Sequence, residues 1–362
     1  MIRLLGLLLL AAGGLAGCDS GSPTGKVEKS WGRPGAELGN FVKPRGLAVD
    51  AARGLVYVAD MSGRIQKFDL DGNALASWKV PDTELGTSEG MAVISGGDLL
   101  VADTHYHRVL RYRFAAGEPG GSWKPLPGDR SPNPYVVGGR GEGPGQFRFP
   151  IAVAVDGQDN FYVSEYGGND RVQKFDAGGR CLLQWGSLGS EPGQFIRPSG
   201  IAVEASGHVL VADAANHRVQ RFTSDGKLLG AWGRQGTGRG GGELHYPYDV
   251  AALSDGSFLV AENYNHRLQR FAADGTSLGL SGGPGREPGQ FSRPWCLAAA
   301  GGGIVYVSDT MNHRVQRVRF TLNDAKVSGV RCQVSAPKPQ APGPDTRNLT
   351  PETCSPPAPG AG

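Results

Sequence analysis

Six acidic residues recur along the chain, and each is followed a few positions later by an arginine. Carboxylates in such number can hold a hard cation such as Ca²⁺ or serve in acid–base chemistry. The same position also suits a structural role, because a carboxylate at a strand end accepts backbone N–H bonds or pairs with the following guanidinium. We favour the structural role for these residues, which are Asp60, Asp103, Glu165, Asp213, Glu262 and Asp309.

The acidic positions mark an internal repeat. They lie at intervals of 43 to 62 residues, which matches propeller blades and exceeds leucine-rich or ankyrin repeats. The 58 glycines and 25 prolines also disfavour a helical bundle, since both residues destabilise helix interiors. Within one unit the pattern predicts four short strands separated by Ser-Gly and Asp-Gly turns. These strands are residues 201–203, 209–212, 218–222 and 227–232.

The loop Asn216-His217-Arg218 and two counterparts, Asn265-His266-Arg267 and Asn312-His313-Arg314, resemble the NHL-repeat family. The resemblance covers about residues 26–320 and implies an all-β, six-bladed β-propeller of four-stranded blades. The other three loops depart from the motif, so their shapes can differ; they are Ser62-Gly63-Arg64, Tyr106-His107-Arg108 and Asn169-Asp170-Arg171.

The ring is expected to close through the N-terminal strand. The stretch 30–44 mirrors 184–198, yet no complete blade precedes it. A strand around 27–31 would complete the blade formed by 294–320 and remove an exposed edge. Residues 326–334 are the alternative, and the N-terminus is favoured because it carries the tryptophan of the repeat. Five tryptophans near the fourth-strand position are expected to pack between blades: Trp31, Trp78, Trp123, Trp185 and Trp232.

Candidate binding residues lie where one blade departs from the others. In a propeller, the second-to-third-strand loops and the starts of the innermost strands surround one mouth of the central channel. Trp295 follows Pro294 at such a start, where other blades carry Arg45, Ile151, Ser199 and Tyr248. An aromatic-rich rim suits a peptide, glycan or small molecule, although these loops can also merely cover strand ends. The predicted ligand-binding residues are Arg45, His105, Tyr106, Glu165, Tyr166, Tyr248, Tyr264 and Trp295.

The histidines argue against a zinc enzyme. An amidating lyase of the NHL family holds zinc with histidines that include ones directly after the proline of an inner strand, and none of the matching positions here is histidine. Four histidines occupy the repeated loop position, and His208 falls on the opposite rim. Only His105 and His245 can then approach the mouth, whereas a catalytic zinc needs three protein ligands. The four loop residues, expected to be structural, are His107, His217, His266 and His313.

No cofactor is therefore expected, with one alternative. Glu165, Glu262 and Asp249 could bind a Ca²⁺ in the channel, as in gluconolactonase-like propellers. A metal-dependent lyase or hydrolase at the channel mouth, using Glu165, Glu262, His105 and His245, is the alternative to a binding protein.

The N-terminus reads as an export signal. Arg3 precedes an apolar run from Leu4 to Leu15 that is too short to span a bilayer, and Leu15-Ala16-Gly17-Cys18 resembles a bacterial lipobox. We expect a signal peptide over 1–17, lipidation of Cys18, a tether over 18–25, the propeller over 26–335 and a disordered, proline-rich tail over 336–362. The other four cysteines suit an oxidising compartment, and Cys332–Cys354 is one of several possible bridges.

These features predict a lipid-anchored protein of the bacterial cell envelope, on its periplasmic or extracellular face. Its predicted partners are the membrane and a protein, peptide or glycan ligand. Nucleic acid is disfavoured because 37 basic and 34 acidic residues nearly balance. The long spacing between the second and third repeats comes from residues 117–143, which we place on the mouth rim as either a lid or a slack loop.

Overall fold

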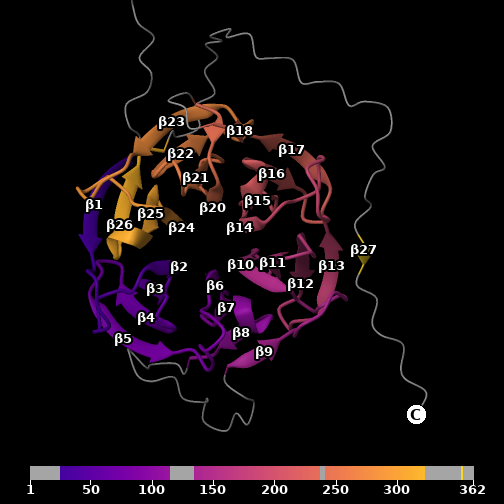
Figure 1. Cartoon of the computed structure of the whole chain (residues 1–362), viewed down its shortest axis with the longest axis horizontal. Helices are drawn as coiled ribbons and strands as arrows, with labels where there is room; N and C mark the ends of the chain where they lie inside the picture. Colours follow the sequence, from indigo (N-terminus) through magenta and orange to yellow (C-terminus); the bar gives the residue numbers. More distant parts are fainter. Residues whose placement is uncertain (1–24, 115–133, 237–240, 323–351, 354–362) are drawn as a thin grey trace, which may run out of the picture.

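The computed structural model describes residues 25–114, 134–236, 241–322 and 352–353. Six antiparallel sheets stand around a central axis as the blades of a propeller, each running from an innermost to an outermost strand (Figure 1). The predicted all-β, six-bladed architecture is confirmed. Because every second residue of a strand faces a neighbouring blade, short strands rich in Val, Leu and Phe can pack on both faces.

The strands follow one another in chain order. Blade 1 contains β2 (Pro44–Asp50), β3 (Leu55–Asp60), β4 (Arg64–Asp69) and β5 (Ala74–Lys79). Blade 2 contains β6 (Met91–Val93), β7 (Leu99–Asp103), β8 (Arg108–Tyr112) and β9 (Tyr135–Val137). Blade 3 contains β10 (Phe149–Val155), β11 (Phe161–Tyr166), β12 (Arg171–Phe175) and β13 (Cys181–Trp185). Blade 4 contains β14 (Pro198–Val203), β15 (Val209–Asp213), β16 (Arg218–Phe222) and β17 (Leu228–Trp232). Blade 5 contains β20 (Pro247–Ala252), β21 (Phe258–Glu262), β22 (Arg267–Phe271) and β23 (Ser277–Gly282).

Blade 6 closes the ring with strands from both ends of the propeller. It contains β24 (Pro294–Gly301), β25 (Ile304–Asp309) and β26 (Arg314–Phe320), with β1 (Gly25–Trp31) as its outermost strand. In Figure 1 the indigo β1 lies beside the orange β26, and the two pair antiparallel with Trp31 opposite Val315. The Trp31 ring also lies 6.0 Å from the ring of Phe68 in blade 1. The predicted closure by the N-terminal strand is confirmed.

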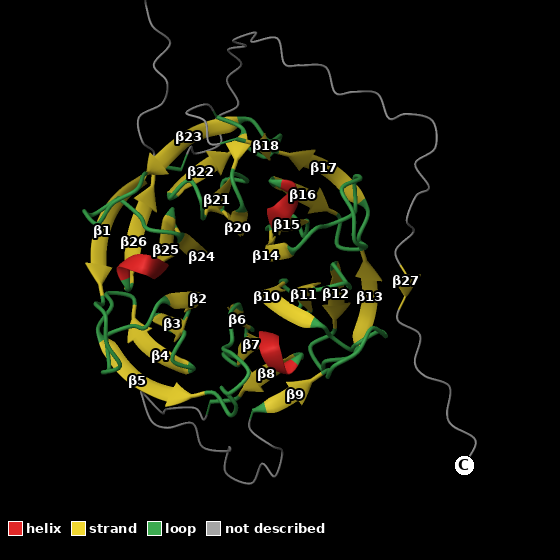
Figure 2. Ribbon diagram, in the orientation of Figure 1, coloured by secondary structure: helices red, strands yellow, loops and turns green. Residues whose placement is uncertain are grey.

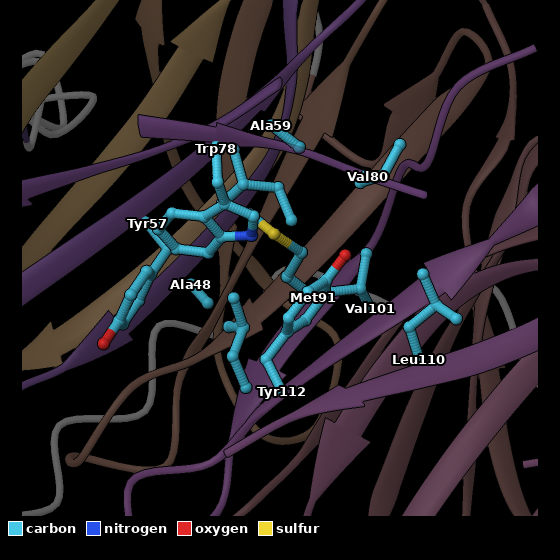
Figure 3. Packing of buried hydrophobic residues seen from close by; sticks show 11 residues of the cluster. Ala48, Tyr57, Ala59, Trp78, Val80, Met91, Val101, Leu110 and Tyr112 are labelled. Atoms are coloured by element: carbon cyan, nitrogen blue, oxygen red, sulfur yellow. The ribbon is translucent and has the colours of Figure 1, made fainter. Parts of the chain in front are cut away.

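Hydrophobic cores lie between neighbouring blades. Figure 3 shows the cluster between blades 1 and 2, where Tyr57 and Trp78 meet Met91 and Tyr112. Trp185 and Trp232 pack in the same way in later clusters, as expected. The tryptophan at position 123 lies outside the described residues. The blades are therefore held by side-chain packing, while hydrogen bonds mainly hold the strands within each blade.

Among the residues that the structure describes, helix is confined to single turns. The 3₁₀ turns η1 (Thr104–Tyr106), η2 (Ala214–Asn216) and η3 (Thr310–Asn312) form second-to-third-strand loops (Figure 2). Within the described ranges, no helix is long and apolar enough to cross a membrane.

Two short pairings lie outside the blades. β18 (Arg234–Gln235) pairs in parallel with β19 (Glu243–Leu244), and β27 (Glu352–Thr353) adds to the outer edge of β13. Cys181 on β13 is disulfide-bonded, and Cys296 is free among the cysteines that the structure describes. The proposed Cys332–Cys354 bridge lies outside the described residues.

The predicted insertion over 117–143 lies only partly within the described residues. Its residues 135–137 form β9, the outermost strand of blade 2, and residues 138–143 lead from β9 toward blade 3. Residues 117–133 lie outside the described residues, so a lid or a loop on the mouth rim stays a prediction for them.

Candidate binding site at the channel mouth

The acidic repeat residues are buried within their own blades. Asp213 accepts hydrogen bonds from Arg218 Nε at 2.7 Å and from the backbone amide of Ile196 at 2.8 Å. Glu165 is equally inaccessible and accepts a hydrogen bond from Arg171 Nε at 2.6 Å. The structural interpretation is confirmed. Glu165 is also a predicted ligand-binding residue, and the structure encloses its carboxylate and bonds it to Arg171.

The loop histidines join each blade to the next. His217 has a left-handed backbone (φ 56°), and its Nδ1 accepts the Tyr246 amide at 3.1 Å. In blade 3 this position holds Asp170, whose Oδ1 accepts the Arg197 amide at 2.7 Å. The expected structural role is confirmed. These bonds hold four rim residues in left-handed conformations directly before a proline: Lys43, Arg197, Tyr246 and Arg293.

All six blades line an open pocket of about 260 Å³ on the channel axis. Blades 1 and 3 to 6 contribute the residue that follows the proline at the start of the innermost strand, and blade 2 contributes its counterpart Glu89. Every blade except the first also contributes the next residue, which is small or polar. Three predicted ligand-binding residues lie here: Arg45, Tyr248 and Trp295. The complete lining is Arg45, Glu89, Gly90, Ile151, Ala152, Ser199, Gly200, Tyr248, Asp249, Trp295 and Cys296.

Glu89 is a pocket residue that the sequence analysis missed. Its Oε1 accepts a hydrogen bond from the Arg45 guanidinium at 2.8 Å, and its Oε2 accepts one from the Trp295 indole N–H at 3.3 Å. No proline directly precedes Glu89, so the pattern of a proline followed by a rim residue does not include blade 2. The signal was present, because Glu89-Gly90-Met91-Ala92-Val93 repeats the pattern of Arg45-Gly46-Leu47-Ala48-Val49.

Aromatic and cationic side chains stack around the pocket. The Arg45 guanidinium lies 4.2 Å from the centroid of the Trp295 ring, and this ring lies 4.0 Å from that of Tyr248. Cation–π contacts of this kind contribute about 0.5–2 kcal/mol, depending on desolvation. Burial raises the pKa of Tyr248 to about 12, so its hydroxyl remains a hydrogen-bond donor at neutral pH.

Arg197 extends this arrangement above the pocket. Its guanidinium lies 4.9 Å from the Tyr166 ring centroid and donates to the Tyr248 hydroxyl at 3.3 Å. Burial raises the pKa of Tyr166, and the Glu89 charge adds to this shift. Sequence analysis missed Arg197, although the following Pro198 marks its position. We call the following six residues the mouth cluster: Arg45, Glu89, Tyr166, Arg197, Tyr248 and Trp295.

The remaining predicted residues lie further out. Tyr264 is 45% exposed and reaches the cluster through Tyr246, whose ring centroid is 5.3 Å from its own. The Tyr106 hydroxyl accepts the Leu85 amide, so this side chain serves a loop and is not part of the cluster. His105 packs edge-on toward Phe149.

The predicted metal alternatives do not assemble. Glu262 is buried and bonded to Arg267 at 2.6 Å, as Glu165 is to its own arginine. His245 stacks on Tyr264. Across the described ranges, no three His, Cys, Asp or Glu side chains are grouped to hold a metal ion. Glu165 and Glu262, which belong to both predicted metal sets, are instead hydrogen-bonded to the arginines of their own blades.

Asp249 instead joins two innermost strands beneath the cluster. Its Oδ2 accepts the Leu297 amide of blade 6 at 2.7 Å, and its Oδ1 accepts the Val250 amide at 2.9 Å. Burial raises its pKa to about 7. Burial also raises the pKa of the neighbouring Cys296 thiol well above its usual value, which keeps this thiol protonated.

Comparison with known proteins identifies the repeat. Residues 195–222, 244–271 and 291–318 match the model of the NHL repeat. The chain is 30% identical over 180 residues to NHL repeat-containing protein 3 of Mus musculus, covering 47% of this chain and 49% of that protein. It is 29% identical over 137 residues to peptidyl-glycine alpha-amidating monooxygenase B of Xenopus laevis, covering 35% of this chain and 14% of that protein. The chain thus matches about half or less of either relative.

Solved structures share the fold at low identity. Virginiamycin B lyase from Staphylococcus aureus gives a TM-score of 0.54 at 12% identity, covering 82% of this chain and 100% of that one. A gluconolactonase from Xanthomonas campestris gives a TM-score of 0.54 at 13% identity, and the match covers 78% of this chain and 88% of that one. A protein of unknown function from Bacteroides thetaiotaomicron gives a TM-score of 0.57 at 16% identity, and the match covers 82% of this chain and 76% of that one. The chain contains NHL repeats that form a six-bladed β-propeller.

Proposed function

We propose that this propeller is a binding protein of the bacterial cell envelope, tethered to a membrane, that holds a protein, peptide or glycan at its channel mouth. The observation that carries the proposal is the mouth cluster. Trp295, Tyr248 and Tyr166 gather there with two guanidinium groups over an open pocket. Aromatic and arginine side chains around a concave site are the usual anchors of recognition surfaces.

The departure of these residues from the repeat supports the proposal. Packing and hydrogen bonds within and between blades account for the acidic anchors, the loop histidines and the blade tryptophans. The starts of the innermost strands differ in every blade, holding Arg, Glu, Ile, Ser, Tyr and Trp. Packing within a blade requires no such variety, whereas an asymmetric ligand does.

A pull-down from envelope extract tests this proposal. The bait is the full chain, and the mouth variant combines Tyr166→Ala with Trp295→Ala. The control variant combines Tyr135→Ala with Leu229→Ala, which removes two exposed apolar side chains from outermost strands. We expect the wild type and the control to retain the same bound species and the mouth variant to lose it. Equal retention by all three proteins would refute binding at the mouth.

The membrane tether is a separate part of the proposal. It is supported by the apolar run before Leu15-Ala16-Gly17-Cys18, and one thioether-linked diacylglycerol supplies two acyl chains, the usual requirement for stable anchoring. Cys18→Ser should move the protein from the membrane fraction to the aqueous fraction after cell lysis. Unchanged partition would rule out the lipid anchor and leave the mouth proposal intact.

A further inference from the structure

We infer that the channel mouth recognises a monoanionic carboxylate attached to a flat, apolar group, with Arg197 as its counter-ion. This inference rests on the proposed binding function and names the chemistry of the ligand.

Arg197 is a partly buried cation without an anionic partner. Other buried arginines of the propeller pair with carboxylates, as Arg171 does with Glu165 at 2.6 Å and Arg270 with Asp255 at 2.5 Å. Within the part of the chain that the structure describes, no ion pair reaches Arg197, and its buried Nε has no hydrogen-bond partner. An arginine cannot lose its proton to relieve this, so an anion from outside the chain is the natural partner.

The backbone holds Arg197 in this position. Its φ of 58° is left-handed, which is unfavourable for a residue with a side chain, and the Asp170 carboxylate fixes it through the backbone amide. The side chain then lies between Tyr166 and Tyr248.

The charge balance of the cluster favours one negative charge over two. Arg45 is already neutralised by Glu89 at 2.8 Å, so the two guanidinium groups and one carboxylate leave one net positive charge. A dianionic phosphate would bring its second charge near Glu89. A planar carboxylate also matches the fork of a guanidinium, and the un-ionised phenols add hydrogen-bond donors.

The rings define the rest of the ligand. The ring centroids of Tyr248 and Trp295 lie 4.0 Å apart beside the pocket. The Arg45 Nε on the pocket wall is a second buried hydrogen-bond donor without a partner. A flat or apolar group next to the carboxylate would stack on these rings while its acid group meets Arg197.

Matched pairs of ligands test the inference. Isothermal titration calorimetry compares N-acetylphenylalanine with N-acetylphenylalaninamide, and glucuronate with glucose, on the purified full chain. One charge-assisted hydrogen bond corresponds to at least about tenfold in affinity, so the acid of a pair should bind that much more tightly than its neutral partner. Preference in the first pair indicates a peptide source of the carboxylate, and preference in the second a sugar acid. Absence of an acid preference in both pairs would overturn the inference.

A matched variant controls for charge. Arg197→Gln should abolish the acid preference, whereas Arg293→Gln should keep it, because Arg293 holds the same pre-proline position in an exposed setting. The unliganded R197Q protein should unfold at the wild-type temperature or above it, since it loses an uncompensated cation. A lower unfolding temperature, or equal loss of preference in R293Q, would contradict the assignment. If R197Q binds acid and amide as the wild type does while the mouth variant binds neither, the mouth proposal stands and the carboxylate inference falls.

Discussion

The backbone amide of Lys43 donates a hydrogen bond to the ring Nδ1 of His313, which lies 3.2 Å away and 270 residues later in the chain. This bond joins the loop of the last blade to the first innermost strand. His217 and His266 form the same bond with Tyr246 and Arg293. The loop motif of one blade thus sets the backbone from which the next blade presents its rim residue.

Acid should weaken these bonds, because a protonated imidazole has no acceptor nitrogen. Burial lowers the pKa of His217 and His266 below the ordinary 6.5, and neighbouring His245 and Arg293 lower them further. Their contribution to the free energy of unfolding is therefore complete above pH 6.5 and declines as the pH falls below it. Urea unfolding from pH 8 to pH 5 measures this decline.

The control for this prediction is His217→Asn with His266→Asn. Asparagine tolerates the left-handed backbone and can accept a hydrogen bond through its side-chain oxygen, much as Asp170 does in blade 3. The double variant should show a shallower loss of stability toward pH 5. An identical pH profile in both proteins would contradict the role of these imidazoles.

Asp249 should have the opposite pH dependence. Its pKa is about 7 in the fold against 3.8 ordinarily, so the unfolded chain releases this proton first and stability falls as the pH rises from 4 to 7. The shift corresponds to about 4 kcal/mol in total. Relative to the wild type, Asp249→Asn should gain stability from pH 4 to pH 8 in thermal or urea unfolding. A difference that does not change with pH would show that Asp249 ionises normally.

Removing one acidic anchor should destabilise the propeller strongly. Asp213→Ala removes a buried carboxylate and leaves the partly buried Arg218 without its ionic partner, and breaking such a pair costs about 3–5 kcal/mol. Glu142→Ala, which breaks an exposed pair with Arg148, should cost less than about 1 kcal/mol. Denaturant midpoints of the two variants give the comparison, and similar midpoints would refute the anchoring role.

Loss of the closing strand should open the ring. Deletion through Trp31 removes the partner of β26 and exposes a strand edge, so we expect a lower unfolding temperature and aggregation. Deletion only through residue 24 serves as the control. Differential scanning calorimetry and light scattering follow both effects, and equal behaviour of the two truncations would show that β1 is dispensable.

The amino-acid sequence by itself determined the blade count, the acidic anchors, the loop histidines and the closure by the N-terminal strand. These features depend on short-range patterns: a strand that ends in an acid, a tight loop and an arginine form one local network that recurs in each blade. Six copies of such a unit can bury their hydrophobic faces only against one another, so the pattern implies the ring.

Only the tertiary structure decided which side chains meet at the mouth. Glu89 pairs with Arg45 from an adjacent blade and with Trp295 from a position 206 residues away. Tyr106, which resembles a rim residue in sequence, has its hydroxyl bonded to the Leu85 amide in the loop between β5 and β6. A repeat pattern specifies contacts within a blade and with its neighbour. Convergence on the axis instead depends on ring closure and on the left-handed residues before the prolines of blades 1, 4, 5 and 6. In blade 4 this conformation places Arg197 between two tyrosines of different blades.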